Sequence, residues 1–133
     1  MSVVINPECK AAVDVLKQKV NRAVIFRADA ATRELVVDRT FPEGTQYDDV
    51  ISNLVDDHGR FLVVDFQYTN KENVATSKPI FIFWYPHAIS AEEIELYSNA
   101  RAPFSQDVGI PMLIQAVDQN EITPSCITYY LNQ

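Results

Sequence analysis

The sequence predicts an α/β (α+β) fold in which a mixed central β-sheet lies between helices. The first observation is the order of the elements, because helical and strand-like patterns follow one another as α-β-β-α-β-β-α-β-α. The second is that the strongest strand patterns are continuous apolar runs, which are typical of strands covered on both faces. The third is size, since 133 residues, 47% of them hydrophobic, suit one domain with its own core. We therefore expect residues 1–133 to form a single domain.

The first elements are a helix and a hairpin. Residues 6–18 are typical of a helix, because Asn6 suits the N-cap, Pro7 suits the first turn and apolar residues recur at helical spacing. Residues 22–26 and 34–38 have strand-like composition, and the polar segment between them makes a hairpin plausible.

The middle of the chain carries a second helix and the two strongest strands. Residues 45–55 are expected to form the helix, with Thr45 as its cap and acidic residues in its first turn. The strands 60–68 and 79–85 are β-branched and aromatic throughout. The polar residues 69–78 between them are interpreted as either a hairpin loop or a disordered tip.

The last part of the chain predicts a helix, a strand and a closing helix. Residues 90–101 form the third helix, and Ser90 followed three residues later by Glu93 is a capping-box pattern. A strand is expected over residues 110–117 and a closing helix over 120–131.

Two kinds of side chain are expected in the core. Trp84 ends an apolar run that is too apolar for an edge strand, so we expect it to be largely buried at the end of a central strand. Cys9 and Cys126 lie at opposite ends of the chain, which leaves a disulfide open. Because the N-terminus has no secretory-signal pattern, we expect both thiols to be reduced and buried.

The charge argues against two classes of partner. The net charge is −7, and phosphate-backbone binding relies on lysine and arginine, so we expect no nucleic-acid partner. An acidic domain is equally unsuited to an anionic membrane surface. The apolar run Ile80–Pro86 is far shorter than the ~20 residues of a membrane helix, so no membrane insertion is expected.

No pattern for catalysis, a metal or a cofactor is present. The chain has three glycines, too few for a phosphate-cradling loop. His58 and His87 have no metal-ligand spacing to each other or to a cysteine. The cluster Asp56-Asp57-His58 lies between a helix and a strand, and we interpret it as a solvated turn. We therefore expect no enzyme, with no catalytic residue, no metal and no cofactor.

The strands and their borders carry a resemblance to a known family. The segments that carry it are "ATRELVVD", "YDDVISNLVDDHGRFLVVDFQY", "KPIFIFWYP" and "LIQAVD", in that order. Asp65-Phe66-Gln67-Tyr68 fits an aspartate-aromatic-acid/amide-aromatic pattern, Trp84-Tyr85-Pro86 fits Trp-x-Pro, and Tyr97 follows thirteen residues after that tryptophan. Together they resemble the actin-depolymerising factor/cofilin family over roughly residues 5 to 131. The resemblance implies the actin-depolymerising-factor homology (gelsolin-like) fold.

The same resemblance implies a partner and a binding surface. The family binds actin monomers and filaments and accelerates filament disassembly. By family position, the surface takes in Ser2 and Val3 at the N-terminus, Tyr97 and Arg101 in the long helix, and Lys78 in a second patch. Ser2 resembles the N-terminal serine whose phosphorylation switches many members off, although Val3 stands where the family usually has glycine.

The chain departs from the family pattern where the surface should be charged. Glu92 and Ile94 stand where the long helix typically carries basic residues, and both are assigned to the actin-binding surface by position. Tyr129 and Tyr130 replace charged residues expected in the last helix. Pro103 has no counterpart inside the family's helix, and because proline removes a backbone donor, we expect this helix to end or kink near residue 102.

Two interpretations of these departures are open. Glu92 and Glu95 either lie on an ordinary solvated helix face or meet a partner with altered charge. Accordingly, the first expectation is an actin-binding protein of the cytoplasm and actin cytoskeleton. It would be monomeric, would bind actin monomers, filaments or both, and would modulate filament turnover with weak severing. The alternative is an interaction module that keeps the cofilin fold but has lost strong actin binding and contacts another protein.

Overall fold

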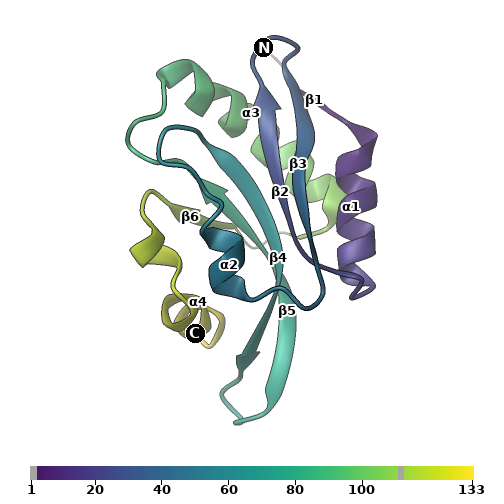
Figure 1. Cartoon of the computed structure of the whole chain (residues 1–133), viewed down its shortest axis with the longest axis vertical. Helices are drawn as coiled ribbons and strands as arrows, with labels where there is room; N and C mark the ends of the chain where they lie inside the picture. The colour runs from purple at the N-terminus through teal and green to yellow at the C-terminus, as the bar shows by residue number, and fades with distance from the viewer. Residues whose placement is uncertain (1–2, 111–112) are drawn as a thin grey trace.

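The computed structural model describes residues 3–110 and 113–133. Within them the strands form one sheet in the order β1-β3-β2-β4-β5-β6 (Figure 1). The strands are β1 (Val4–Ile5), β2 (Asn21–Asp29), β3 (Glu34–Pro42), β4 (Arg60–Thr69), β5 (Ala75–Trp84) and β6 (Leu113–Ala116). The pairs β1–β3 and β5–β6 are parallel and the pairs between them are antiparallel, which confirms the predicted mixed sheet.

Helices cover both faces of this sheet. They are α1 (Pro7–Lys17), α2 (Tyr47–Ile51), α3 (Ala91–Val108) and α4 (Pro124–Leu131), with a 3-10 turn η1 (Gln119–Ile122). The buried side chains of α1 and α3 pack on one face, and those of α2, η1 and α4 pack on the other. The predicted placement of the sheet between helices is therefore confirmed.

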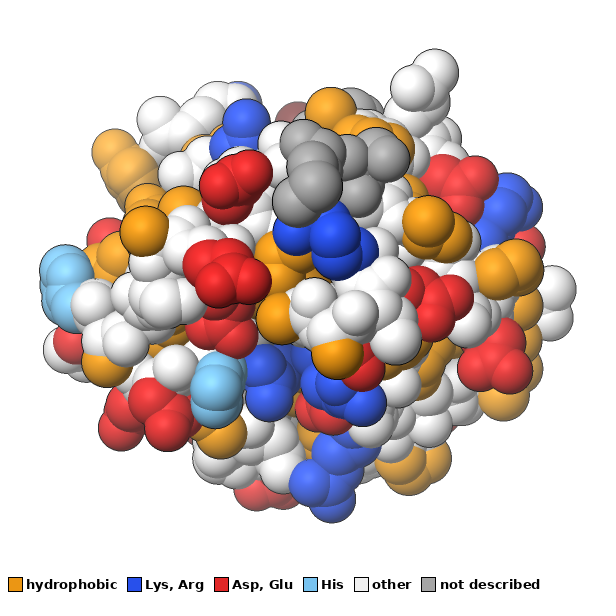
Figure 2. All heavy atoms as spheres, turned by 90° about the horizontal axis from the view of Figure 1, so that it is seen from above, with side chains coloured by type: hydrophobic (Ala, Val, Ile, Leu, Met, Phe, Trp, Pro, Cys, Tyr) orange, Lys and Arg blue, Asp and Glu red, His pale blue; other side chains and the backbone are white. Residues whose placement is uncertain are grey.

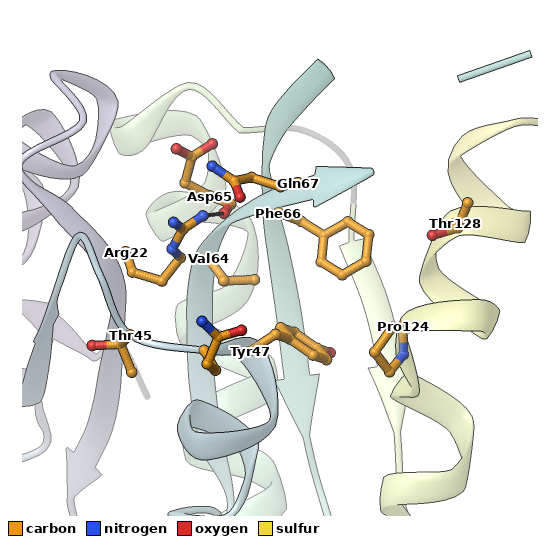
Figure 3. A pocket seen from close by; sticks show the side chains of 10 residues that line it. Arg22, Thr45, Tyr47, Val64, Asp65, Phe66, Gln67, Pro124 and Thr128 are labelled. Carbon is orange, nitrogen blue, oxygen red and sulfur yellow. Dashed lines mark hydrogen bonds between the residues drawn. The ribbon is translucent and has the colours of Figure 1, made fainter. Parts of the chain in front are cut away.

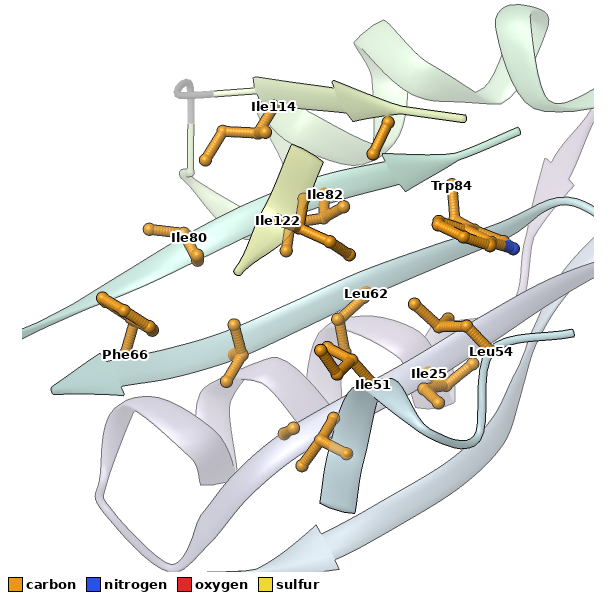
Figure 4. Packing of buried hydrophobic residues seen from close by; sticks show 14 of the residues in the cluster. Ile25, Ile51, Leu54, Leu62, Phe66, Ile80, Ile82, Trp84, Ile114 and Ile122 are labelled. Carbon is orange, nitrogen blue, oxygen red and sulfur yellow. The ribbon is translucent and has the colours of Figure 1, made fainter. Parts of the chain in front are cut away.

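Each face of the sheet buries its own cluster. On the α1/α3 side the core is aromatic, and Phe61 makes ring contacts with Phe81, Phe83, Tyr97 and Phe104 at centroid distances from 4.9 to 5.6 Å. The other side is mainly aliphatic and includes Trp84 (Figure 4).

The predicted burial of Trp84 at the end of a central strand is confirmed. It is the last residue of β5, which lies between β4 and β6, and only 1% of it is exposed. Its indole Nε1 donates to the Val55 carbonyl at 2.7 Å. The side chain therefore ties the loop after α2 to the middle of the sheet.

Local hydrogen bonds make several elements longer or shorter than predicted. The strands β4 and β5 extend into residues 69–78, so this segment is a hairpin with its turn at residues 70–74, where the Asn70 side chain accepts from two backbone N–H groups. The helix expected over 45–55 is shorter, because the side chains of Ser52 and Asn53 donate to the Asp49 carbonyl and compete with the helical ladder.

The ends of two further predicted elements also differ. The expected cap Thr45 is not the N-cap of α2, since that position is held by Gln46, which makes no side-chain cap bond. The helix predicted over 120–131 is divided at Thr123, because a residue before proline favours extended backbone. Part of the strand predicted over 110–117 lies outside the described residues.

The third helix was predicted to end or kink near residue 102. It does not end there, because α3 continues through Pro103 to Val108. Phe104 and Val108 lie beyond the proline and are both buried. Burying two such side chains contributes about 1.5–3 kcal/mol each, which offsets the ~3 kcal/mol cost of an interior proline. The helix ends instead at Gly109, whose φ of 70° is the left-handed conformation that glycine tolerates.

The prediction for the cysteines is half correct. Both thiols are free, and Cys9 is buried, but Cys126 is exposed. Cys126 lies in the first turn of α4, where the Thr123 hydroxyl accepts from its backbone N–H and its own thiol donates to the Asn120 carbonyl at 3.4 Å. Among the described residues, no helix is both long and apolar enough to cross a membrane.

Candidate partner-binding surface

The start of α3 is fixed to the loop before β4. The Ser90 hydroxyl accepts from the Glu93 backbone N–H at 3.1 Å, which is the first half of the predicted capping box. The Glu93 carboxylate turns to the neighbouring loop, where it accepts from the Gly59 N–H and lies 3.1 Å from His58 Nδ1. Glu93 therefore orients the helix, and its carboxylate is engaged within the fold.

Tyr97 fixes the same helix from inside. Its hydroxyl donates to the Gly59 carbonyl at 2.6 Å and accepts from the Ala28 N–H at 2.9 Å. Burial raises the pKa of Tyr97, so the hydroxyl stays protonated and keeps donating. The close approach of the Tyr97 ring to the backbone at position 59 requires a glycine there, because a Cβ would lie 2.9 Å from Cε2 of the ring.

This geometry corrects the role expected for Tyr97. Its side chain is 0% exposed and offers no surface to a partner. Tyr97 therefore acts on a partner only through the helix that it holds.

The outer side of α3 presents the other predicted residues of the helix. Glu92 and Glu95 are exposed, and Ile94 is 39% exposed. Arg101 is half-buried and, within the part of the chain that is described, makes no hydrogen bond or ion pair. Between residues 92 and 101, α3 thus carries acidic, apolar and basic groups at its surface.

The N-terminal strand lies beside this helix. β1 contacts α3, and Val3, just before β1, is half-buried against the core on that side. The structure therefore places Val3 on the same side of the sheet as α3. Ser2 lies outside the described residues.

The end of the molecule that holds the start of α3 has mixed charge. Figure 2 shows Lys and Arg side chains gathered in a band, with Asp and Glu side chains on both sides. Arg27 and Arg60 both approach Asp38, at 3.4 and 3.8 Å. Arg27 and Arg60 thus share one carboxylate, and the charge at this end of the molecule is mixed.

A second group of predicted residues lies away from the start of α3 (Figure 1). Lys78 is exposed on β5, opposite Phe66 in the strand register. On α4, Tyr129 is 73% exposed and Tyr130 is 45% exposed. The Asn132 side chain, just after α4, donates to the Thr69 carbonyl at 3.2 Å, so the end of α4 is tied to the end of β4.

A cavity of about 200 Å³ lies between β4, the segment before α2, and α4 (Figure 3). Arg22 donates to the carbonyls of Glu43 and Asp65, at 2.8 and 3.1 Å for its closest contacts, and the Tyr47 hydroxyl donates to the Ile122 carbonyl at 2.7 Å. These polar groups are thus used to join elements of the fold. Within the described residues, no three His, Cys, Asp or Glu side chains gather as a metal site.

Sequence reasoning missed one connection beneath the second group. Asp65 is 1% exposed, and both of its carboxylate oxygens accept from Lys19, 46 residues away. A single aspartate inside the apolar run 61–66 indicates a buried partner, but the sequence does not say which lysine supplies it.

The whole chain is similar to known proteins. The sequence profile described as "Cofilin/tropomyosin-type actin-binding protein" matches residues 2–132. Actin-depolymerizing factor 8 of Arabidopsis thaliana is 31% identical over 130 residues, covering 96% of this chain and 93% of that relative. Actin-depolymerizing factor 1 of Oryza sativa subsp. japonica is 33% identical over 118 residues, covering 87% of this chain and 85% of the relative.

Solved structures show the same fold. The crystal structure of cofilin from Streptomyces griseoflavus superposes with a TM-score of 0.83 at 23% identity, covering 95% of this chain and 94% of that one. Actin depolymerization factor 2 of Plasmodium berghei superposes with a TM-score of 0.82 at 24% identity, covering 98% and 96%.

Proposed function

Because the chain belongs to the family of cofilin/tropomyosin-type actin-binding proteins, we propose that it binds actin and promotes the disassembly of actin filaments. The observation that carries this proposal is the family match over residues 2–132, together with relatives named actin-depolymerizing factors that align over nearly their whole length. The mechanism needs no covalent chemistry. A ligand that binds one actin conformation more tightly shifts the population toward it, in proportion to that preference.

The contact is proposed to use both groups of residues described above. The outer side of α3, with Glu92, Ile94 and Arg101, and the adjoining N-terminus at Val3 would form the first patch. Lys78, near the base of the β4–β5 hairpin, would belong to a second patch that filaments require in addition. The support is that β1 lies beside α3 and that Lys78 is exposed on another part of the molecule.

Ser2 is proposed as a modification site at the edge of the first patch. Its neighbour Val3 packs against the core that α3 also covers, and a phosphate at position 2 would add negative charge to a chain whose net charge is already −7. Replacing Ser2 with glutamate should weaken binding of monomeric actin, and replacing it with alanine should leave binding unchanged. Equal affinities for both variants would argue against the site.

A titration of fluorescently labelled monomeric actin tests the first patch. Replacing Ile94 with aspartate should weaken binding about tenfold, because an apolar side chain that is exposed in the free protein becomes buried at the interface. Replacing Val74 with aspartate provides the matched control, since Val74 is 55% exposed at the hairpin turn, away from α3. Equal binding by both variants would exclude Ile94 from the contact.

A second candidate function is favoured by one observation. The first turn of α3 exposes Glu92 where the sequence resemblance implies a basic residue, and acidic surface suits a basic partner. In that case the chain would keep the fold, bind actin poorly and contact another protein. Binding of monomeric actin that is undetectable at micromolar concentration would favour this candidate.

We further propose that the protein acts in the cytoplasm, on the actin cytoskeleton, as a monomeric domain and by binding alone. The support is the family match, because its members are described by the binding of actin. Light scattering coupled to size-exclusion chromatography should give the mass of one chain, 15.1 kDa. A mass twice as large would contradict the monomeric state.

A further inference from the structure

The β4–β5 hairpin extends past the rest of the sheet. Among the described residues, β2 pairs with β4 only as far as Val64, and β6 pairs with β5 only from Phe81 onward. The remaining residues, 65–69 and 75–79, pair only with each other, and we call them the ribbon. Figure 1 shows the ribbon projecting from the body of the protein. A two-stranded ribbon is only marginally stable by itself, so its direction depends on what holds its base.

One face of the ribbon rests on the helical layer of α2 and α4. Phe66 is buried and contacts the Tyr47 ring at a centroid distance of 5.2 Å, while Tyr68 and Leu131 pack against the same core. These contacts stop the ribbon from bending away from α4, but they do not act on its opposite face.

On the opposite face, the Lys19 side chain reaches both strands, while Arg22 also donates to the backbone carbonyl of Asp65 at 3.1 Å. Lys19 Nζ donates to both carboxylate oxygens of Asp65, at 3.0 and 2.9 Å, and to the Ser77 hydroxyl at 2.8 Å. Asp65 belongs to β4 and Ser77 to β5, so one ammonium group joins both strands of the ribbon at its base. Figure 3 shows the Asp65 side chain directed away from the cavity, on the other side of the strand from Phe66.

Lys19 is well placed to act as a fixed point. It lies in the turn between α1 and β2, with a φ of 67°, and its backbone N–H donates to the Leu16 carbonyl at 2.9 Å. Its side chain is 53% exposed, whereas that of Asp65 is 2% exposed. A buried carboxylate requires a partner, so the geometry of the pair is set by Asp65, and the lysine connects it to the end of α1.

We propose that Lys19 and Asp65 form a clamp that sets the direction of the ribbon and thereby positions the second actin contact, including Lys78. This inference rests on the proposed function, in which filaments need the second patch and monomers do not. Lys19 is a positioning residue, because its effect on a partner passes through the ribbon. Losing the clamp should therefore weaken filament binding selectively.

The test uses a double variant that removes the clamp without leaving a buried charge. In Lys19→Met/Asp65→Asn both side chains keep their approximate length and shape, and both charges are lost. The matched control is Lys10→Met, which removes an exposed lysine from the Lys10–Asp14 pair of α1. Lys19→Arg is the conservative rescue, because arginine also donates to a carboxylate.

Amide hydrogen exchange measures directly whether the clamp holds the strands of the ribbon together. In the double variant, ribbon amides that are hydrogen-bonded across the strands should exchange about tenfold faster, while those of residues 61–64 and 80–83 keep their protection. Filament co-sedimentation should then show about a tenfold weaker Kd, with monomer affinity within about twofold of the wild type. Lys10→Met and Lys19→Arg should behave as the wild type does.

Each contrary result overturns a defined part of the inference. Unchanged ribbon exchange in the double variant overturns the clamp. Faster ribbon exchange with unchanged filament binding, or equal losses for filaments and monomers, overturns the positioning role. If the wild-type protein binds neither form of actin, the proposed function and the positioning role fail together, while hydrogen exchange still decides whether the clamp exists.

Discussion

Replacing Trp84 with alanine should destabilise the whole protein by about 4–6 kcal/mol. Truncating a fully buried aromatic side chain costs about 3–5 kcal/mol, because the surroundings close only partly around the cavity. The Val55 carbonyl also loses the 2.7 Å hydrogen bond from the indole, which adds about 1 kcal/mol or more. A domain of this size has only about 5–15 kcal/mol of stability, so the variant should lie near the limit of folding.

Urea unfolding followed by far-ultraviolet circular dichroism measures this loss. Fluorescence is unsuitable for the comparison, because Trp84 is the only tryptophan in the chain. Replacing Trp84 with phenylalanine keeps most of the ring but not the hydrogen bond, so it should cost about 1–3 kcal/mol. Replacing Tyr129 with alanine is the exposed aromatic control and should change stability by about 0.5 kcal/mol or less.

Two results would refute the reasoning. If the alanine variant unfolds at the same urea concentration as the wild type, Trp84 does not contribute to the core as its burial implies. If the wild type unfolds in two separate transitions, of which only one responds to the substitution, the chain is not one cooperative domain.

Three further predictions follow from the surface and its support. Gly59→Ala should lower the free energy of unfolding by about 1–3 kcal/mol, because the new Cβ would meet the buried Tyr97 ring. Gly44→Ala is the control and should be nearly neutral, since nothing lies within 4 Å of its Cβ. Equal melting temperatures for the two variants would contradict this packing. Glu92→Lys should strengthen the binding of monomeric actin at low salt, and the gain should shrink at high salt because exposed charges are screened. If the variant binds no better and only loses ~0.3–1 kcal/mol of stability through the helix dipole, Glu92 is part of a solvated helix face. Because α4 exposes Tyr129 and Tyr130 in place of charged residues, filament severing watched by microscopy should be slower than for basic family members, and equal rates would exclude this reasoning.

The features that follow from local pattern were predictable from the sequence. The strands around Phe61 and Phe81 are apolar on both faces, and this pattern predicted a sheet covered by helices on both sides. Asn6 and Pro7 predicted the start of α1 because capping depends on neighbouring residues only. The buried position of Trp84 followed from the same reasoning.

The features that depend on distant residues were not predictable. The continuation of α3 through Pro103 depends on the rings that receive Phe104, including Phe26 at 4.9 Å, and these lie on other strands. Tyr97 was assigned to the surface by its place in a motif, whereas its partners Gly59 and Ala28 place it in the core. The ion pair between Lys19 and Asp65 likewise depends on the three-dimensional arrangement of α1 and β4.

Sedimentation of actin filaments with increasing amounts of this protein tests the central claim most directly. The family match and the fold predict that the protein pellets with the filaments and that the amount of actin left in the supernatant rises with its concentration. Bovine serum albumin at the same concentrations controls for trapping in the pellet. A protein that stays entirely in the supernatant while all the filamentous actin still pellets, and that also binds no monomeric actin, would contradict the account.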